Sequence, residues 1–269
     1  MKYCMASNAA VSSTTPVPIG GDFCEILRKA GSLGLHAIEI HVPDVSVLDL
    51  PALKKAMAET GVAVATLGTG TIYGKYGLHL CDENEANQER IVSMVCRFID
   101  CAAELSSCVT IGSIKGNILP GQDREKHMAI FGMLLRRIDA YAAQRGVTVL
   151  LEATNRYENN VLNTGAQVAE IIRQNGLTST KALLDVFHMN IEEADCLKAL
   201  EEAKDVLGHI HFADNNRHYP GAGCFDFAPL AAKIREIGYD GVLSVECLPL
   251  PDSETATVKA AQFLRDMFD

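Results

Sequence analysis

The chain switches repeatedly between two spacings of apolar residues along its whole length. Eight short apolar runs bounded by glycine or polar residues predict buried strands at 1–7, 36–42, 62–68, 108–114, 147–153, 181–187, 209–214 and 241–247. Between them, apolar residues recur at i, i+3 and i+4 and predict helices at 23–34, 50–61, 86–105, 124–146, 165–176, 196–208, 227–239 and 255–268. Gly61, Gly146 and Gly208 each end a helical pattern just before a strand, as C-cap glycines do.

The strand and helix patterns form eight β–α pairs. Spread over 269 residues, they give units of about 34 residues, which is the size of a βαβ unit. This repeat predicts a (β/α)8 TIM barrel in which residues 1–269 form a single domain. A doubly wound open sheet is the alternative fold, but no G-x-G-x-x-G follows the first predicted strand. The closed barrel is therefore favoured.

Composition and charge indicate which binding partners and which cellular compartment to expect. The net charge of −10 argues against binding to the phosphate backbone of a nucleic acid. Nine cysteines without a C-x-x-C motif are typical of reduced thiols in a reducing compartment. No run approaches the roughly 18 apolar residues of a membrane span, and the first residues do not resemble a signal peptide. We therefore predict a cytoplasmic protein with no membrane and no nucleic-acid partner.

Four residues with metal-binding side chains end predicted strands: Glu152, Asp185, His211 and Glu246. In a parallel barrel the carboxyl ends of the strands meet at one mouth, so these four side chains are expected to converge. Three carboxylates in one buried place repel each other unless a cation compensates them. The oxygen-rich set predicts one divalent metal ion, with Mn²⁺ favoured, Mg²⁺ or Co²⁺ as alternatives and Zn²⁺ still open. No nucleotide cofactor is expected.

The same strand ends carry a family resemblance. Segments 152–158, 185–193, 209–217, 220–227 and 244–247 resemble the sugar isomerase/epimerase branch of the xylose isomerase-like TIM barrels, in particular the ketose 3-epimerases typified by D-tagatose 3-epimerase. In the first half, segments 65–70, 77–80 and 111–116 resemble a subgroup that includes 5-keto-L-gluconate epimerase. The resemblance implies a metal-dependent epimerase that inverts C3, the carbon next to the ketone, of a ketose or keto sugar acid.

The resemblance also implies roles for individual residues. The four strand-end residues match the family's metal ligands, and Glu152 and Glu246 match its two proton-transfer residues. Glu158, His188 and Arg217 match groups that hold the carbonyl end of the substrate. Elementary chemistry agrees, because inversion next to a ketone needs a base on each face of the carbon. The metal would act as a Lewis acid that stabilises the cis-enediolate between the two proton transfers.

Further polar residues near the predicted mouth have weaker assignments. Lys115 follows the fourth strand. The resembling subgroup has a basic residue at this position, which implies that Lys115 binds a carboxylate or phosphate of the substrate. His209 should lie one layer deeper than His211 as a hydrogen-bonded core histidine, and Glu39 should be a core carboxylate bonded to a neighbour. The glycine-flanked segment 71–79 is expected to be an exposed loop, with closure over the substrate as the alternative.

The sequence allows some alternative functions and disfavours others. An aldose/ketose isomerase, or an inosose isomerase or dehydratase, would use the same metal site and stays open. An apurinic endonuclease would need further histidines after the second to fourth strands and in the loop after the seventh. The strand ends 66–70 and 111–116 contain none, and 220–227 lacks a histidine pair. A non-catalytic sugar-binding barrel is disfavoured because both proton-transfer glutamates are present. The resemblance implies a homodimer or homotetramer that acts on a small-molecule sugar.

Overall fold

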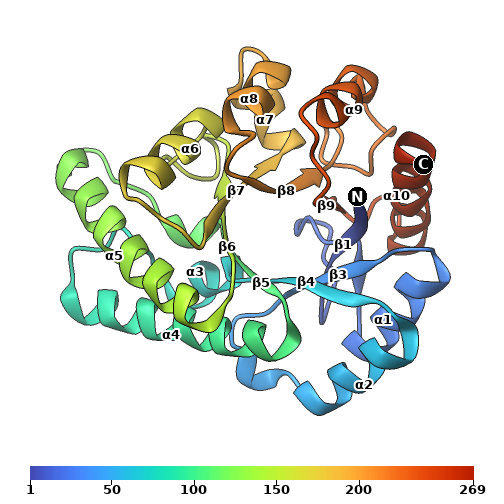
Figure 1. Ribbon diagram of the computed structural model, residues 1–269, viewed down its shortest axis with the longest axis horizontal. Helices are drawn as coiled ribbons and strands as arrows, with labels where there is room; N and C mark the ends of the chain where they lie inside the picture. The colour runs from blue at the N-terminus through green and yellow to red at the C-terminus, as the bar shows by residue number, and fades with distance from the viewer.

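A computed structural model describes residues 1–269, which form a closed parallel β-barrel surrounded by helices (Figure 1). The barrel strands are β1 (Lys2–Asn8), β3 (Ala37–His41), β4 (Ala63–Gly68), β5 (Cys108–Ile111), β6 (Val149–Ala153), β7 (Thr180–Asp185), β8 (Leu207–Phe212) and β9 (Val242–Val245). The barrel closes because β1 pairs in parallel with both β3 and β9. A two-residue strand, β2 (Ile19–Gly20), pairs with the end of β1. The predicted TIM barrel is confirmed.

Eight helices follow the predicted pattern and lie around the barrel (Figure 1). They are α1 (Phe23–Ser32), α2 (Leu50–Thr60), α4 (Glu85–Leu105), α5 (Arg124–Arg145), α6 (Gly165–Gln174), α8 (Cys196–Ala203), α9 (Phe227–Glu236) and α10 (Ser253–Phe268). Gly61 and Gly146 end α2 and α5 in the left-handed conformation, with φ of 71° and 66°. Gly208 does not end a helix, because α8 stops at Ala203 and Gly208 lies within β8. The prediction for Gly208 was wrong.

Short additional helices follow four of the strands. They are α3 (Gly70–Tyr76), the 3₁₀ helices η1 (Val45–Val47) and η2 (Ser113–Lys115), and α7 (Val186–Glu192). Segment 71–79 was predicted as a loop, but its first part is helical and ends at Gly77 in the left-handed conformation. The carboxylate of Asp185 caps α7 by accepting a hydrogen bond from the backbone N–H of Phe187. These insertions lie at the carboxyl ends of the strands.

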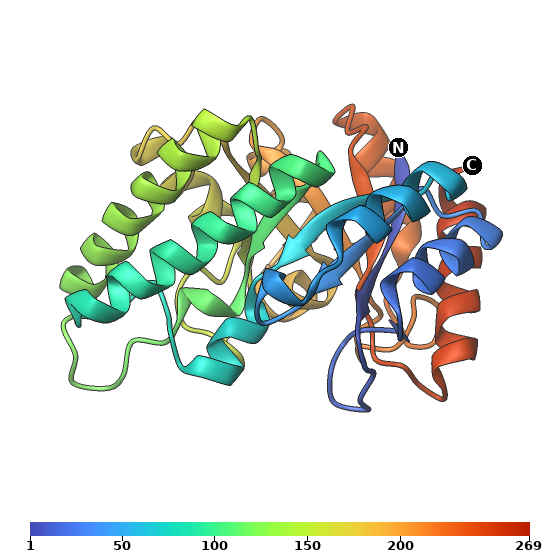
Figure 2. The ribbon, with the colours of Figure 1, turned by 90° about the horizontal axis from the view of Figure 1, so that it is seen from below.

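The apolar core lies between the barrel and its helices, and 71 buried residues form one hydrophobic cluster. In contrast, polar side chains such as Glu39, Thr66, Thr110 and His209 are buried among the strands. In Figure 2 the N-terminus lies at the upper edge and the loop after β1 at the lower edge, so the carboxyl ends of the strands face downward. No helix is both long enough and apolar enough to cross a lipid bilayer.

Candidate active site

The four strand-end residues converge at the carboxyl end of the barrel. Glu152 lies on β6, Asp185 ends β7, His211 lies on β8 and Glu246 directly follows β9. Their potential ligand atoms all lie within 4.8 Å of one another. His211 Nδ1 is 3.5 Å from Glu246 Oε2, 3.8 Å from Glu152 Oε1 and 3.9 Å from Asp185 Oδ2. One side-chain atom from each of four neighbouring strands thus faces a common point.

This group has the chemistry of a divalent metal site. His211 Nδ1 is buried and makes no hydrogen bond, although the other ring nitrogen is bonded to Glu39. An unpartnered buried nitrogen beside three carboxylates is costly unless a cation binds there. Three oxygen ligands and one imidazole suit Mn²⁺, Mg²⁺, Co²⁺ or Zn²⁺. The residues present therefore fit a divalent cation.

The two glutamates of the site have opposite electrostatic environments. Burial, together with the nearby charge of Glu246, raises the pKa of Glu152 to about 8. Burial alone would also raise the pKa of Glu246, but the positive charges of His211 and Arg217 outweigh it and lower that pKa to about 2. Carboxyl groups whose pKa values are driven apart in one site are typical of an acid and a base acting together.

A polar pocket of about 160 Å³ opens over these groups. Of its 19 lining residues only one, Val17, is hydrophobic. Glu152, His211 and Glu246 line the pocket, while Asp185 is fully buried and is not part of the lining. Small-molecule pockets are usually lined mostly by apolar groups, so this lining suits a ligand that carries a hydroxyl group on most of its carbons.

Arg217 lies at the site, although its position in a polar loop was also compatible with a solvent-facing side chain. It is 8% exposed, and its guanidinium donates to Asp185 Oδ2 at 2.5 Å and to Glu246 Oε2. The guanidinium also stacks on the ring of Phe187, 4.6 Å from its centroid. Arg217 therefore holds two of the candidate metal ligands in place while it lines the pocket.

His188 and Glu158 lie beside Arg217, and Asn155 joins them. His188 Nε2 is 3.7 Å from Glu152 Oε1, and burial lowers the pKa of His188 to about 4. Asn155 Nδ2 lies 2.7 Å from His188 Nδ1 and donates to Glu158 Oε1 at 2.9 Å. Because the amide donates to Nδ1, the neutral imidazole carries its proton on Nε2, which faces the site. The sequence prediction missed Asn155, although it lies inside the segment that carried the resemblance.

Lys115 lies deeper than its position in the sequence suggested. Its side chain is fully buried, and Nζ donates to the backbone oxygen of Glu152 at 2.7 Å and to Thr154 Oγ1 at 3.1 Å. Burial lowers the pKa of Lys115 to about 8 even though the charge of Glu152 opposes the shift. Lys115 does not line the pocket, because the 3₁₀ turn of η2 directs the side chain against β6. The ammonium group thus already has two oxygens of the protein as partners, which argues against the predicted contact with a substrate carboxylate.

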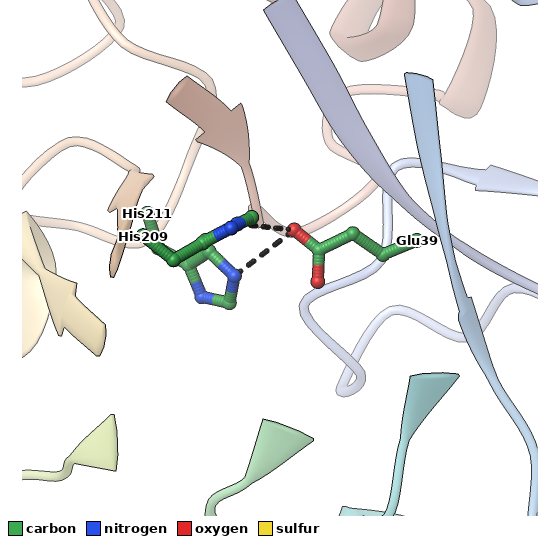
Figure 3. A group of neighbouring side chains, drawn as sticks. All are labelled: Glu39, His209 and His211. Atoms are coloured by element: carbon green, nitrogen blue, oxygen red, sulfur yellow. Dashed lines mark hydrogen bonds and ion pairs between the residues drawn. The ribbon is translucent and has the colours of Figure 1, made fainter. Parts of the chain in front are cut away.

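Beneath the four strand-end residues lies a second polar layer. Glu39 is fully buried, and its Oε1 accepts hydrogen bonds from His209 Nε2 and His211 Nε2, each at 3.0 Å (Figure 3). His209 is thus the hydrogen-bonded core histidine that the alternation on β8 predicted. His41 Nε2 lies 3.5 Å from Glu39 Oε2, and this histidine also lines the pocket.

The chain belongs to the xylose isomerase-like TIM barrel family, which it matches over residues 27–267. It is 29% identical over 239 residues to 3-dehydro-D-guloside 4-epimerase of Escherichia coli (strain K12), covering 82% of this chain and 86% of that protein. It is also 29% identical over 233 residues to D-psicose 3-epimerase of Agrobacterium fabrum, covering 83% and 78%. The crystal structure of 3-keto-D-glucoside 4-epimerase from E. coli in its apo form superposes with a TM-score of 0.84 at 27% identity, covering 99% of each chain. These similarities identify an enzyme of the sugar epimerase and isomerase class.

Proposed function

We propose that the protein is a divalent-metal-dependent epimerase that inverts the carbon next to the ketone of a sugar, C3 in a 2-ketose. The main support is that Glu152 and Glu246 line one pocket from different strands, β6 and the end of β9. The relatives agree with this reaction type, because 3-epimerases of 2-ketoses and 4-epimerases of 3-keto sugars both invert a carbon next to a ketone. A single chemistry therefore accounts for the site and its relatives.

The reaction needs two proton transfers on opposite faces of one carbon. One glutamate removes the proton, and the electrons of the broken C–H bond form the C=C bond of an enediolate while the ketone oxygen gains negative charge. The other glutamate then returns a proton from the opposite face, and the C=O bond re-forms. The proton transfers balance when one glutamate is ionised and the other protonated as the substrate binds, and the lowered pKa of Glu246 and the raised pKa of Glu152 agree with that division. In the reverse direction the roles exchange.

Other residues of the pocket would hold the substrate. A divalent ion held by the four strand-end residues, which we propose to be Mn²⁺, would act as a Lewis acid toward the ketone oxygen and the adjacent hydroxyl. His188 Nε2–H and the guanidinium of Arg217 would donate hydrogen bonds to oxygens at the carbonyl end. Glu158, whose pKa is raised by burial, would accept one from a neighbouring hydroxyl. We also propose a homodimer or homotetramer, which light scattering would test.

The pocket favours a neutral sugar over a sugar acid. Arg217 is the sole arginine or lysine in the lining, and its guanidinium is already paired with two carboxylates. The ammonium of Lys115, on which a keto acid substrate would have depended, is bonded beneath the pocket. We therefore propose a neutral ketose or a keto-glycoside as substrate. Aldose/ketose isomerisation remains the second candidate, because it uses the same enediolate.

Solvent exchange tests the proposal. The protein loaded with Mn²⁺ is incubated in D₂O with a panel of 2-ketoses, 3-keto-glucosides and keto sugar acids, and products are followed by NMR after removal of the metal. Deuterium at the carbon next to the ketone, together with inversion, is expected for a neutral member of the panel. Deuterium at C1 or C2 with formation of an aldose would favour the isomerase instead. Absence of exchange across the panel would refute both, and the double variant Glu152→Gln/Glu246→Gln, which lacks both bases, serves as the inactive control.

A further inference from the structure

Glu39 is the one carboxylate of the barrel interior that the proposed reaction does not use. It lies on β3, fully buried, and reaches across the barrel to two histidines on β8 (Figure 3). β1 and β9 separate these two strands in the barrel. A buried carboxylate is costly unless it is paired and hydrogen-bonded, and here one oxygen, Oε1, accepts from both imidazoles. Glu39 therefore ties opposite walls of the barrel together directly beneath the candidate metal ligands.

The bond to Glu39 fixes the state of His211. When His211 gives up its positive charge to bind a metal ion, Glu39 Oε1, which can only accept, keeps the remaining proton on Nε2. Nδ1 is then left with a free lone pair, and it is this buried atom that faces Glu152, Asp185 and Glu246. Histidines that ligate metals usually donate their other N–H to a carboxylate, which sets both the tautomer and the ring orientation.

His209 reinforces this arrangement. Its Nε2 shares the same oxygen of Glu39, and its ring lies edge-on against that of His211, with centroids 5.0 Å apart and planes at 85°. The two rings therefore limit each other's rotation. A second metal ion among Glu39, His209 and His211 is the competing interpretation, since their ligand atoms also lie within 4.8 Å of one another. That interpretation would require His211 to bridge two cations and would break both hydrogen bonds.

We infer that Glu39 is a positioning residue that holds His211 in the Nε2-protonated tautomer, with Nδ1 directed at the metal, and that His209 braces this pair. The inference rests on the proposed metal site and adds to it a residue that touches neither metal nor substrate. His41 extends the contact to the pocket wall, where its Nε2 lies 3.5 Å from the second oxygen of Glu39.

Metal affinity measured without any sugar tests this inference. Mn²⁺ is titrated calorimetrically into the wild type, Glu39→Gln and the surface control Glu59→Gln, after each has been stripped with a chelator. Wild type and control should bind one ion per chain, and Glu39→Gln should bind it about 10- to 100-fold more weakly. Equal affinity of wild type and Glu39→Gln would overturn the inference, and so would two ions per wild-type chain.

A second measurement does not need Glu39→Gln and applies even if that variant does not fold. In ¹⁵N-histidine-labelled protein loaded with Mg²⁺, two-bond ¹H–¹⁵N spectra should report His211 with its proton on Nε2. Comparison with His209→Gln separates the two imidazole signals. A proton on Nδ1 would overturn the inference. Failure of the proposed function alone would look different, with Mn²⁺ bound in a Glu39-dependent manner but no sugar exchanging its proton.

Discussion

Replacing Gly112 with alanine should displace the carboxylate of Glu152 and leave the rest of the pocket in place. A Cβ atom on Gly112 would lie well under 3.0 Å from Glu152 Oε2, a separation that real Cβ atoms essentially never show. The next nearest atom, Glu152 Cδ, would be 3.6 Å away, which is ordinary contact. The obstacle is therefore the free end of one flexible side chain.

The size of the effect follows from this geometry. To restore ordinary contact the carboxylate oxygen must retreat by about 1 Å, and such a displacement of a reacting group costs about 100-fold in rate. This corresponds to about 2.7 kcal/mol of lost transition-state stabilisation. We expect kcat for epimerisation to fall by about this factor. The circular dichroism spectrum should remain that of the wild type.

Initial rates of sugar interconversion, measured by NMR at saturating Mn²⁺, provide the assay. Gly70→Ala is the matched control, because Gly70 lines the same pocket but its Cβ would meet only the side chain of Ser113, with Oγ at 3.5 Å in ordinary contact. That control should keep a rate close to the wild type. Wild-type kcat in Gly112→Ala would refute the reasoning, and so would an equal loss in both variants.

Four further predictions follow from the site. Glu152→Gln and Glu246→Gln should each lower kcat by about 10²- to 10⁴-fold in the same assay, although one of them should still exchange deuterium into one epimer. Lys115→Met leaves the oxygens of Glu152 and Thr154 without their donor, so urea unfolding should show a loss of about 1–3 kcal/mol, with KM altered equally for acidic and neutral sugars. Folding lowers the pKa of His188 from 6.5 to about 4, so between these pH values the unfolded chain binds a proton at His188 and the folded chain does not. As the pH drops through this window, urea unfolding should show the wild type losing about 3 kcal/mol relative to His188→Gln. Treatment with EDTA should abolish turnover and lower the melting temperature, and added Mn²⁺ should restore both.

The strand ends were predictable because two local rules act together there. Alternation along a strand assigns faces, and parallel strands deliver their last side chains to one edge, so Glu152 and His211 were expected to meet. The same alternation correctly separated His209 from His211 by one layer. These local rules could not predict which side chains bind Glu39, because its partners come from a strand three positions away around the barrel. Their meeting depends on barrel closure.

The errors have local physical causes. Segment 71–79 contains Gly74 and Gly77, residues that disfavour a helix interior, yet α3 forms before Gly77 ends it. For Lys115, position in the sequence gave the end of a strand but not the partners of the side chain, which are the backbone oxygen of Glu152 and the hydroxyl of Thr154. Asn155 was missed because an amide that orients a neighbouring histidine has no spacing signature in the chain.

The scarcity of hydrophobic side chains in the pocket has a consequence for ligand binding. A sugar entering it gains little from the hydrophobic effect and must replace ordered water group by group, so each new hydrogen bond is offset by one that is lost. Ground-state affinity should therefore be modest, and selectivity should arise from donors and acceptors that a wrong stereoisomer leaves unpaired. A planar, charged mimic of the enediolate should bind more tightly than the sugar itself. It would form the interactions that become strong only when negative charge develops on the substrate. Inhibitors of this enzyme are better sought among such charged planar compounds than among apolar ligands.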